Sequence, residues 1–155
     1  MNQYAVFHSI ESAYSFSLNK NQVILRIRVD KKDNISHCYL LYNVKHKFFL
    51  KRKEKELIRK YEDDLYAYYK IKLFLKEYSL AYIFHFVSEG KDYYYSSDGL
   101  CENYQFATSY FNFFQNAFIN DIDIQKEVSW TKDAVIYEIF VDRFYSSQKE
   151  NKTYI

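Results

Sequence analysis

Residues 23–29, Val-Ile-Leu-Arg-Ile-Arg-Val, decide the fold of this chain. Successive side chains of an extended strand point to opposite faces, so the apolar residues at 23, 25, 27 and 29 share one face and the two arginines share the other. A polar turn follows at 30–34, and residues 36–42 repeat the alternation with Cys38, Leu40 and Tyr42 on one side. This period of two predicts two strands that each bury one face.

Further strands are expected along the chain. The alternation over 65–73 predicts a strand, whereas 80–87 is apolar on both faces, as at the centre of a sandwich. Lys53–Tyr61 is ambiguous, because its composition favours a helix while the pattern that follows favours strands. Glu89–Asp92 is the strongest hairpin turn. The other expected elements are short aromatic strands at Tyr4–His8, Tyr14–Leu18, Tyr93–Tyr95 and Tyr110–Phe114, and a turn at Ser96–Gly99.

Size and composition agree with this pattern. The 155 residues have room for one domain and a short appendage. Aromatic residues make up 21% of the chain, with 18 Tyr and 14 Phe, and aromatic side chains favour strands. Because there are only 2 Gly and no Pro, the turns must use Asn, Asp, Ser and Lys. About eight short strands separated by turns predict an all-β fold, a β-sandwich.

Charge and targeting patterns narrow the functional classes. Lys and Arg cluster only in the run Lys45–Lys60, which is either a nucleic-acid patch or, as we favour, a solvated loop and strand face. No signal sequence is visible, and no apolar run approaches the ~20 residues of a membrane span. Cys38 and Cys101 lack CxxC spacing, which indicates buried thiols in a reducing compartment. We therefore expect a cytoplasmic protein without nucleic-acid or membrane partners.

A second decisive stretch lies near the C-terminus. Residues 130–144 read W-T-K-D-A-V-I-Y-E-I-F-V-D-R-F. They resemble the opening of the catalytic barrel in the α-amylase superfamily, in the branch of neopullulanases, cyclomaltodextrinases and maltogenic amylases, whose pattern is close to W-x-K-D-A-V-x-Y-Q-I-F-P-D-R-F. A motif of this length is specific. The signature positions, which we interpret as structural, are Trp130, Tyr137, Asp142, Arg143 and Phe144.

The N-terminal part resembles the same branch. Residues 5–8, 26–33, 40–42, 64–69 and 119–123 match segments of its extra N-terminal domain in order and spacing. The resemblance implies that residues 1–125 form an immunoglobulin-like β-sandwich, a carbohydrate-binding module of family thirty-four. Residues 126–155 would then be a linker and the truncated start of a (β/α)8 glycoside hydrolase barrel.

The resemblance also bears on catalysis and cofactors. A complete barrel needs ~250 residues, and the catalytic carboxylates of glycoside hydrolysis come from later barrel strands. We therefore expect that this chain alone is no enzyme and needs no cofactor. Relatives often hold calcium just after the Arg-Phe pair, but Gln148 and Lys152 replace hard-oxygen ligands here, so we expect no metal.

Two roles remain for the sandwich. In the first, it binds maltodextrins, α-1,4-glucan oligosaccharides or cyclodextrins, because sugar rings lie flat on aromatic side chains. Alternatively, the same rings only cover the sandwich or fill an interface. The candidate ring-stacking residues are Tyr66, Tyr68, Tyr93, Tyr94 and Tyr95.

In the second role, the resemblance implies a homodimer in which this domain narrows the active site of its partner's barrel. The position that would reach the partner is His46, or Phe48 if the loop is shifted. The alternative is a purely structural interaction module with no sugar affinity.

The apolar run Ala134–Val141 raises a separate expectation. It is typical of a parallel strand buried on both faces, yet its barrel partners are missing from this sequence. We expect it to dock on the sandwich, to pair with another copy, or to be disordered.

Overall fold

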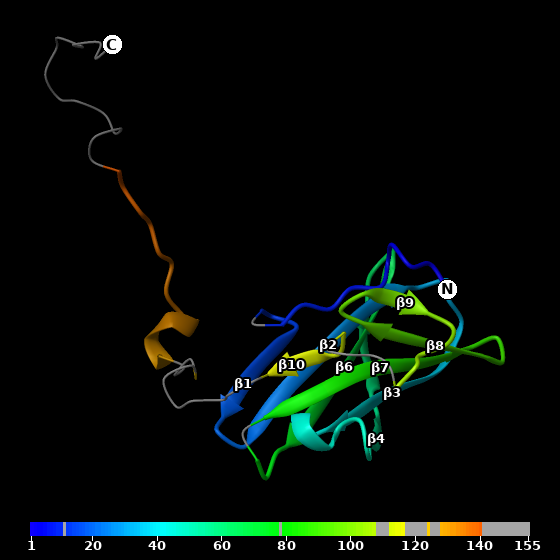
Figure 1. The fold of residues 1–155 in the computed structure, drawn as a ribbon. Helices are drawn as coiled ribbons and strands as arrows, with labels where there is room; N and C mark the ends of the chain where they lie inside the picture. The colour runs from blue at the N-terminus through cyan, green and yellow to red at the C-terminus, as the bar shows by residue number, and fades with distance from the viewer. Residues whose placement is uncertain (11, 78, 108–111, 117–123, 125–127, 141–155) are drawn as a thin grey trace, which may run out of the picture. The chain divides into compact units, whose positions relative to one another are not determined.

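The computed structural model describes residues 1–10, 12–77, 79–107, 112–116, 124 and 128–140. It divides into two compact units, Met1–Gln125 and Lys126–Ile155. The first unit is built from two antiparallel sheets (Figure 1). The first sheet has four strands in the order β1 (Ser15–Asn19), β2 (Gln22–Asp30), β6 (Tyr66–Phe74) and β5 (Ile58–Glu62). The second sheet has six strands, with β4 (Lys53–Glu56), β3 (Ile35–Asn43), β7 (Leu80–Ser88), β8 (Lys91–Ser96) and β9 (Gly99–Cys101) in that order and β10 (Phe114–Asn116) paired with β7.

The core lies between the two sheets and confirms the alternation read from the sequence. β2 and β6 pair along their whole length, from Gln22 opposite Phe74 to Asp30 opposite Tyr66. Their inward side chains are buried, and they meet the inward side chains of β3 and β7. The all-β sandwich is therefore confirmed. The inward residues of these strands are Val23, Leu25, Ile27, Val29, Ala67, Tyr69, Ile71, Leu73, Cys38, Leu40, Leu80, Tyr82, Phe84 and Phe86.

β7 is buried on both faces, as the mainly apolar sequence at 80–87 predicts. Its even-numbered residues face the main core, whereas Ala81 and Ile83 face a second, smaller cluster. That cluster also contains Phe48, which follows the 3-10 helix η1 (Lys45–Lys47), and Phe113. Loop residues thus cover part of the outer face of the second sheet.

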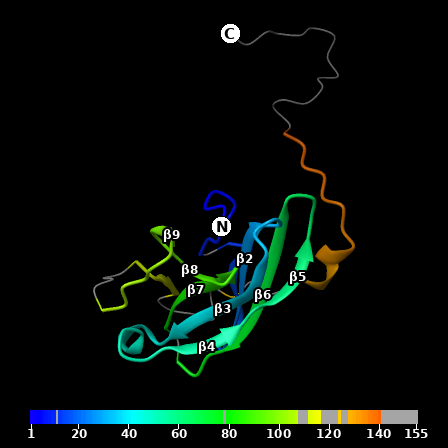
Figure 2. The same cartoon turned by 90° about the vertical axis from the view of Figure 1, so that its right-hand side faces the viewer.

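The ambiguous stretch Lys53–Tyr61 forms strands and no helix. β4 pairs with β3 and β5 pairs with β6, so the chain passes from one sheet to the other at Leu57 (Figure 2). Leu57 is buried, and its backbone N–H donates to the Cys38 carbonyl over 2.7 Å. Burial of this one side chain and pairing with existing strands override the helix propensity of the lysines and glutamates around it.

The expected strand at Tyr4–His8 is wrong. The segment makes a turn, in which the Ala5 N–H donates to the Asn2 carbonyl over 3.1 Å, and then a single bridge between Phe7 and Arg28. The expected strand at 110–114 lies partly outside the described residues, and β10 begins at Phe114. Cys38 and Cys101 are both free thiols; Cys38 is buried as expected, whereas Cys101 is only half-buried.

The predicted hairpin turn forms between β7 and β8 at Glu89 and Gly90, whereas Lys91 and Asp92 already belong to β8. The turn carries a stability prediction. Glu89 and Gly90 have positive φ angles of 52° and 77°, a combination typical of two-residue hairpin turns. No atom lies within 4 Å of a Cβ added to Gly90, so Gly90→Ala should cost only backbone strain, about 1 kcal/mol of unfolding free energy. Urea unfolding measures it, with Lys91→Ala as the matched control. A neutral Gly90→Ala variant would contradict this turn geometry.

In the second unit, the 3-10 helix η3 (Ser129–Lys132) precedes a segment, 134–140, without regular secondary structure. Residues 134–140 form no strand in this unit, and Val135 is 96% exposed. The strand expected at Ala134–Val141 is therefore not formed within 134–140, because no partner strand is described beside it; residue 141 lies outside the described part. Across the described residues of both units, no helix is long and apolar enough to cross a membrane.

Candidate functional site

The outer face of the first sheet carries a continuous group of rings and cations, which we call the aromatic–arginine face. The strand register places Arg28 opposite Tyr68 across β2 and β6, and Tyr61 opposite Tyr68 across β5 and β6. The face consists of Phe7, Tyr14, Phe16, Arg26, Arg28, Tyr61, Tyr66 and Tyr68.

Tyr68 lies near the centre of this face and is held from two sides. Its ring is 5.2 Å from the Tyr61 ring, centroid to centroid, and its hydroxyl donates to Asp63 Oδ2 over 2.9 Å. Partial desolvation, followed by the bond to Asp63, raises the pKa of Tyr68 to about 12, so the phenol is neutral at physiological pH. Asp63 is itself fixed by the backbone N–H groups of Leu65 and Tyr66. The turn that precedes β6 therefore fixes the orientation of the Tyr68 ring.

Arginine guanidinium groups lie between the rings. The Arg28 guanidinium carbon is 4.2 Å from the Tyr66 ring centroid and 5.2 Å from that of Phe7. Arg26 lies 5.2 Å from the Phe16 ring centroid in the same way. Such contacts orient the planar groups and keep their edges available for hydrogen bonds. Of the sequence candidates, Tyr66 and Tyr68 are thus brought together here.

The three tyrosines of β8 do not form one platform. Because a strand alternates, Tyr93 and Tyr95 pack against the main core, while Tyr94 belongs to the small cluster on the other face. Tyr94 stacks on His85 with centroids 4.7 Å apart and planes 10° apart. Burial raises the pKa of both Tyr94 and Tyr95.

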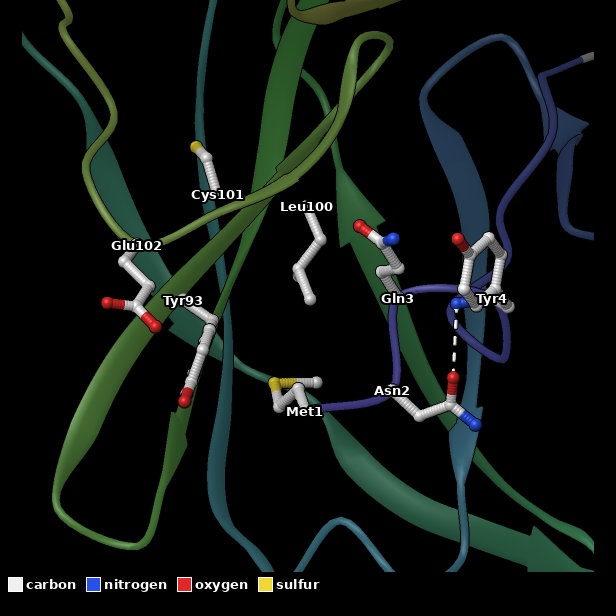
Figure 3. A pocket seen from close by; sticks show the side chains of 8 residues that line it. All are labelled: Met1, Asn2, Gln3, Tyr4, Tyr93, Leu100, Cys101 and Glu102. Carbon is white, nitrogen blue, oxygen red and sulfur yellow. Dashed lines mark hydrogen bonds between the residues drawn. The ribbon is translucent and has the colours of Figure 1, made fainter.

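Tyr93 also lines a pocket of about 410 Å³ (Figure 3). One wall comes from the N-terminal segment, where the Tyr4 N–H donates to Asn2 Oδ1 over 3.3 Å, and the other from β8 and β9. Polar and apolar side chains both line the pocket. Its lining residues are Met1, Asn2, Gln3, Tyr4, Tyr93, Leu100, Cys101 and Glu102.

A ladder of imidazole and phenol rings crosses the outer face of the second sheet. The Tyr39 ring stacks on His37, with centroids 5.5 Å apart, and is tilted against His85 at 5.7 Å. Each histidine meets a carboxylate at 2.8 Å, Glu56 at His37 and Asp92 at His85. Sequence reasoning missed this ladder, since the three rings come from two strands whose pairing the sequence does not give.

The two predicted partner-contact residues separate in the structure. His46 is exposed on η1, but Phe48 is fully buried among the rings of Phe49, Phe106 and Phe113. Of the pair, only His46 lies at the surface of this chain.

The basic run Lys45–Lys60 spreads over η1, β4 and β5 instead of forming one compact patch. Several of its cations already have partners: Lys47 pairs with Glu77, and Arg59 pairs with Glu62. Arg52 lies 3.9 Å from the Phe106 ring centroid and donates to two backbone carbonyls.

The barrel-signature residues fall in the second unit. Trp130 lies in η3 and is 64% exposed, and Tyr137 is 78% exposed. Asp142, Arg143 and Phe144, together with the loop at 145–152 that bears on calcium, lie outside the described residues.

The sequence resembles curated enzymes over nearly its whole length. A cyclomaltodextrinase of Thermoanaerobacter pseudethanolicus is 29% identical over 147 residues, which are 95% of this chain and 25% of that protein. Neopullulanase 2 of Thermoactinomyces vulgaris is 26% identical over 153 residues, with the same shares of 95% and 25%. This chain therefore spans about a quarter of the length of the curated relatives it matches.

Solved structures share the fold. A cyclomaltodextrinase structure matches 88% of this chain, and 23% of its own, with a TM-score of 0.75 and 23% identity. A maltogenic amylase from S. marinus matches 75% of this chain, and 14% of its own, with a TM-score of 0.53 and 17% identity. Residues 1–120 match the family described as "Alpha amylase, N-terminal ig-like domain", and because this match covers most of the sequence, the chain belongs to that family.

Proposed function

We propose that this chain is the non-catalytic N-terminal part of an α-glucan-hydrolysing glycoside hydrolase. In this proposal residues 1–125 are the sandwich domain, and residues 126–155 lead into the first strand of a catalytic barrel. The observation that carries it is the family match over 1–120, together with relatives named cyclomaltodextrinase and neopullulanase that align over 95% of the chain.

The domain helps to bind maltodextrin or cyclodextrin through the aromatic–arginine face. Tyr61 is 61% exposed, and half-buried Tyr66 and Tyr68 stand beside it on the same surface. Sugar rings present C–H faces that pack on aromatic rings, while their hydroxyls need hydrogen-bonding groups close by, which the tyrosine hydroxyls and arginines supply. The β8 tyrosines are weaker candidates, because two of the three rings pack against the core.

Calorimetric titration of the chain with maltotriose and β-cyclodextrin tests this role. Tyr68→Ala should weaken binding about tenfold, because one ring contact contributes about 1–1.5 kcal/mol, whereas Tyr68→Phe keeps the ring and most of the affinity. Tyr4→Ala removes a tyrosine that is 88% exposed in the pocket, and it should leave the affinity unchanged. If Tyr4→Ala abolishes binding while Tyr68→Ala does not, the sugar lies in the pocket and this face is not the site. Thermal melts of each variant establish that it is folded.

An assembly role is the second candidate. The loop that carries exposed His46 also exposes Leu50, at 86%, and an exposed apolar side chain beside a histidine suits a protein contact. In this role the domain forms the dimer contact that gates the active site. Light scattering on the titrated samples separates the two: self-association without heat from either sugar would favour assembly, and a monomer that binds sugar would favour the glucan module.

A further inference from the structure

The aromatic–arginine face has more positive charge than the binding of a neutral sugar requires. β2 directs Arg26 and Arg28 outward, and the register places Lys70 opposite Arg26 and Lys72 two residues further along β6. None of these four cations is ion-paired with a carboxylate among the described residues. The two arginines of the face and the two lysines beside it therefore carry four positive charges, none of which forms an ion pair among the described residues.

The carboxylates at the edge of the face are engaged elsewhere. Asp30 accepts hydrogen bonds from Asn2 Nδ2 at 2.8 Å and from the Lys32 backbone N–H at 3.0 Å. Asp63 accepts from Tyr68 and from two backbone N–H groups. Both carboxylates keep their negative charge, but neither lies within ion-pair distance of Arg26 or Arg28, so the arginine edges remain available to an external anion.

Arg28 is held ready for such an anion. Its guanidinium lies between Tyr66 and Phe7, and its Nε donates to the Ala5 carbonyl over 3.4 Å. Its two terminal nitrogens have no hydrogen-bond acceptor among the described residues. An arginine whose plane is fixed loses little conformational entropy when it binds, and its fork matches two oxygens of a phosphate.

We propose that the aromatic–arginine face binds phosphorylated α-glucan, with the phosphate monoester on Arg28 and Arg26 and adjacent glucose rings on Tyr66, Tyr68 and Tyr61. The inference rests on the proposed glucan-binding role and adds the charge of the ligand to it. Rings that receive sugar faces and cations that receive a dianion alternate on one surface, so a ligand that carries both groups satisfies both sets. Lys70 and Lys72 extend the positive field along the same strand.

The test compares four ligands by calorimetric titration of the full chain: maltoheptaose, maltoheptaose with a glucose 6-phosphate monoester, glucose 6-phosphate and inorganic phosphate. We expect the phosphorylated oligosaccharide to bind at least about tenfold more tightly than maltoheptaose, with an advantage that shrinks as salt rises. Arg28→Gln should reduce the ratio of the two affinities to about one, because it removes the phosphate contact in addition to any hydrogen bond that Arg28 makes to the neutral sugar. Arg28→Lys keeps the charge but not the fork, and it should restore the advantage in part.

Two further variants serve as a second probe and as a control. Arg26→Gln is an independent probe should Arg28→Gln unfold the chain. Lys53→Gln removes a charge from β4 of the other sheet, and it should leave the affinity for all four ligands unchanged.

Equal affinity for neutral and phosphorylated maltoheptaose would overturn the phosphate inference while the glucan-binding proposal stands. No affinity for either would overturn both. Inorganic phosphate binding as tightly as the phosphorylated oligosaccharide would reveal a simple anion site. Self-association that Arg28→Gln abolishes would show that the face binds an acidic surface of another protein molecule. Either of these last two outcomes would contradict the proposal.

Discussion

Phe84→Ala should lower the free energy of unfolding by about 3–5 kcal/mol, the cost typical of a large aromatic side chain lost from a packed core. Phe84 is fully buried in the middle of β7, the central strand of the second sheet. Its ring packs against His8 at 4.8 Å, Tyr82 at 5.8 Å and Phe114 at 6.0 Å between centroids. These neighbours belong to three separate segments, so they cannot all move in to fill the space that alanine would leave.

Urea unfolding followed by tyrosine fluorescence or circular dichroism measures this loss. Phe74→Ala is the matched control, since Phe74 is 66% exposed at the end of β6 and its removal should cost less than about 1 kcal/mol. A cost for Phe84→Ala no greater than that of Phe74→Ala would mean that the inward face of β7 does not form the packed core described above.

The second large effect is a loss of stability in acid that depends on His8. The ring is buried, with Nδ1 2.6 Å from the Arg26 carbonyl and Nε2 2.8 Å from the Tyr82 hydroxyl. In the neutral ring Nδ1–H donates to the carbonyl, and Nε2 accepts from the hydroxyl. Burial lowers the pKa of His8 from 6.5 to about 4, although the bond to the Arg26 carbonyl opposes this shift.

The direction of the pH effect follows from that lowered pKa. Between pH 6.5 and pH 4 the unfolded chain binds a proton at His8 that the folded chain does not, so acid favours unfolding. The full stability is present above pH 6.5, and about 3 kcal/mol of it is lost by pH 4. Carboxylates with lowered pKa, such as Asp63, add to the loss at the acid end of this range.

Urea unfolding at several pH values between 7.5 and 4 isolates the histidine contribution. His8→Gln lacks the titrating group, so its unfolding free energy should fall by about 3 kcal/mol less than that of the unmodified chain over this range. His46→Gln removes an exposed imidazole instead, and it should follow the unmodified chain. Identical pH slopes for His8→Gln and the unmodified chain would contradict the account of a buried neutral ring.

Several elements were predictable because their signal is local. Alternation at 23–29 and 65–73 identified the inward faces of β2 and β6, and the apolar run at 80–87 identified a central strand. The turn between β7 and β8 was predictable because Gly90 has a positive φ angle, a conformation that glycine adopts without steric cost. The family membership inferred from the motifs is confirmed by the match over 1–120.

Other features depended on contacts between distant segments. Lys53–Tyr61 has a helical composition, but β3 and β6 offer open edges to pair with, and Leu57 has a core to enter. Tyr4–His8 has the composition of a strand, yet His8 finds its partners in the core and the segment makes only one bridge. Propensity is a weak local preference, and burial and strand pairing outweigh it.

The sequence by itself determined which residues alternate, where the sharp turn lies and which family the chain resembles, because each of these is written in neighbouring residues. Only the tertiary structure decided which of the many aromatic rings act together. It separated Tyr94 from Tyr93 and Tyr95, buried Phe48, and placed Tyr61, Tyr66 and Tyr68 beside Arg28 on one face. The physical reason is that strand pairing joins β2 to β6 across a long stretch of chain, and a composition rich in tyrosine leaves that choice open until the sheets form.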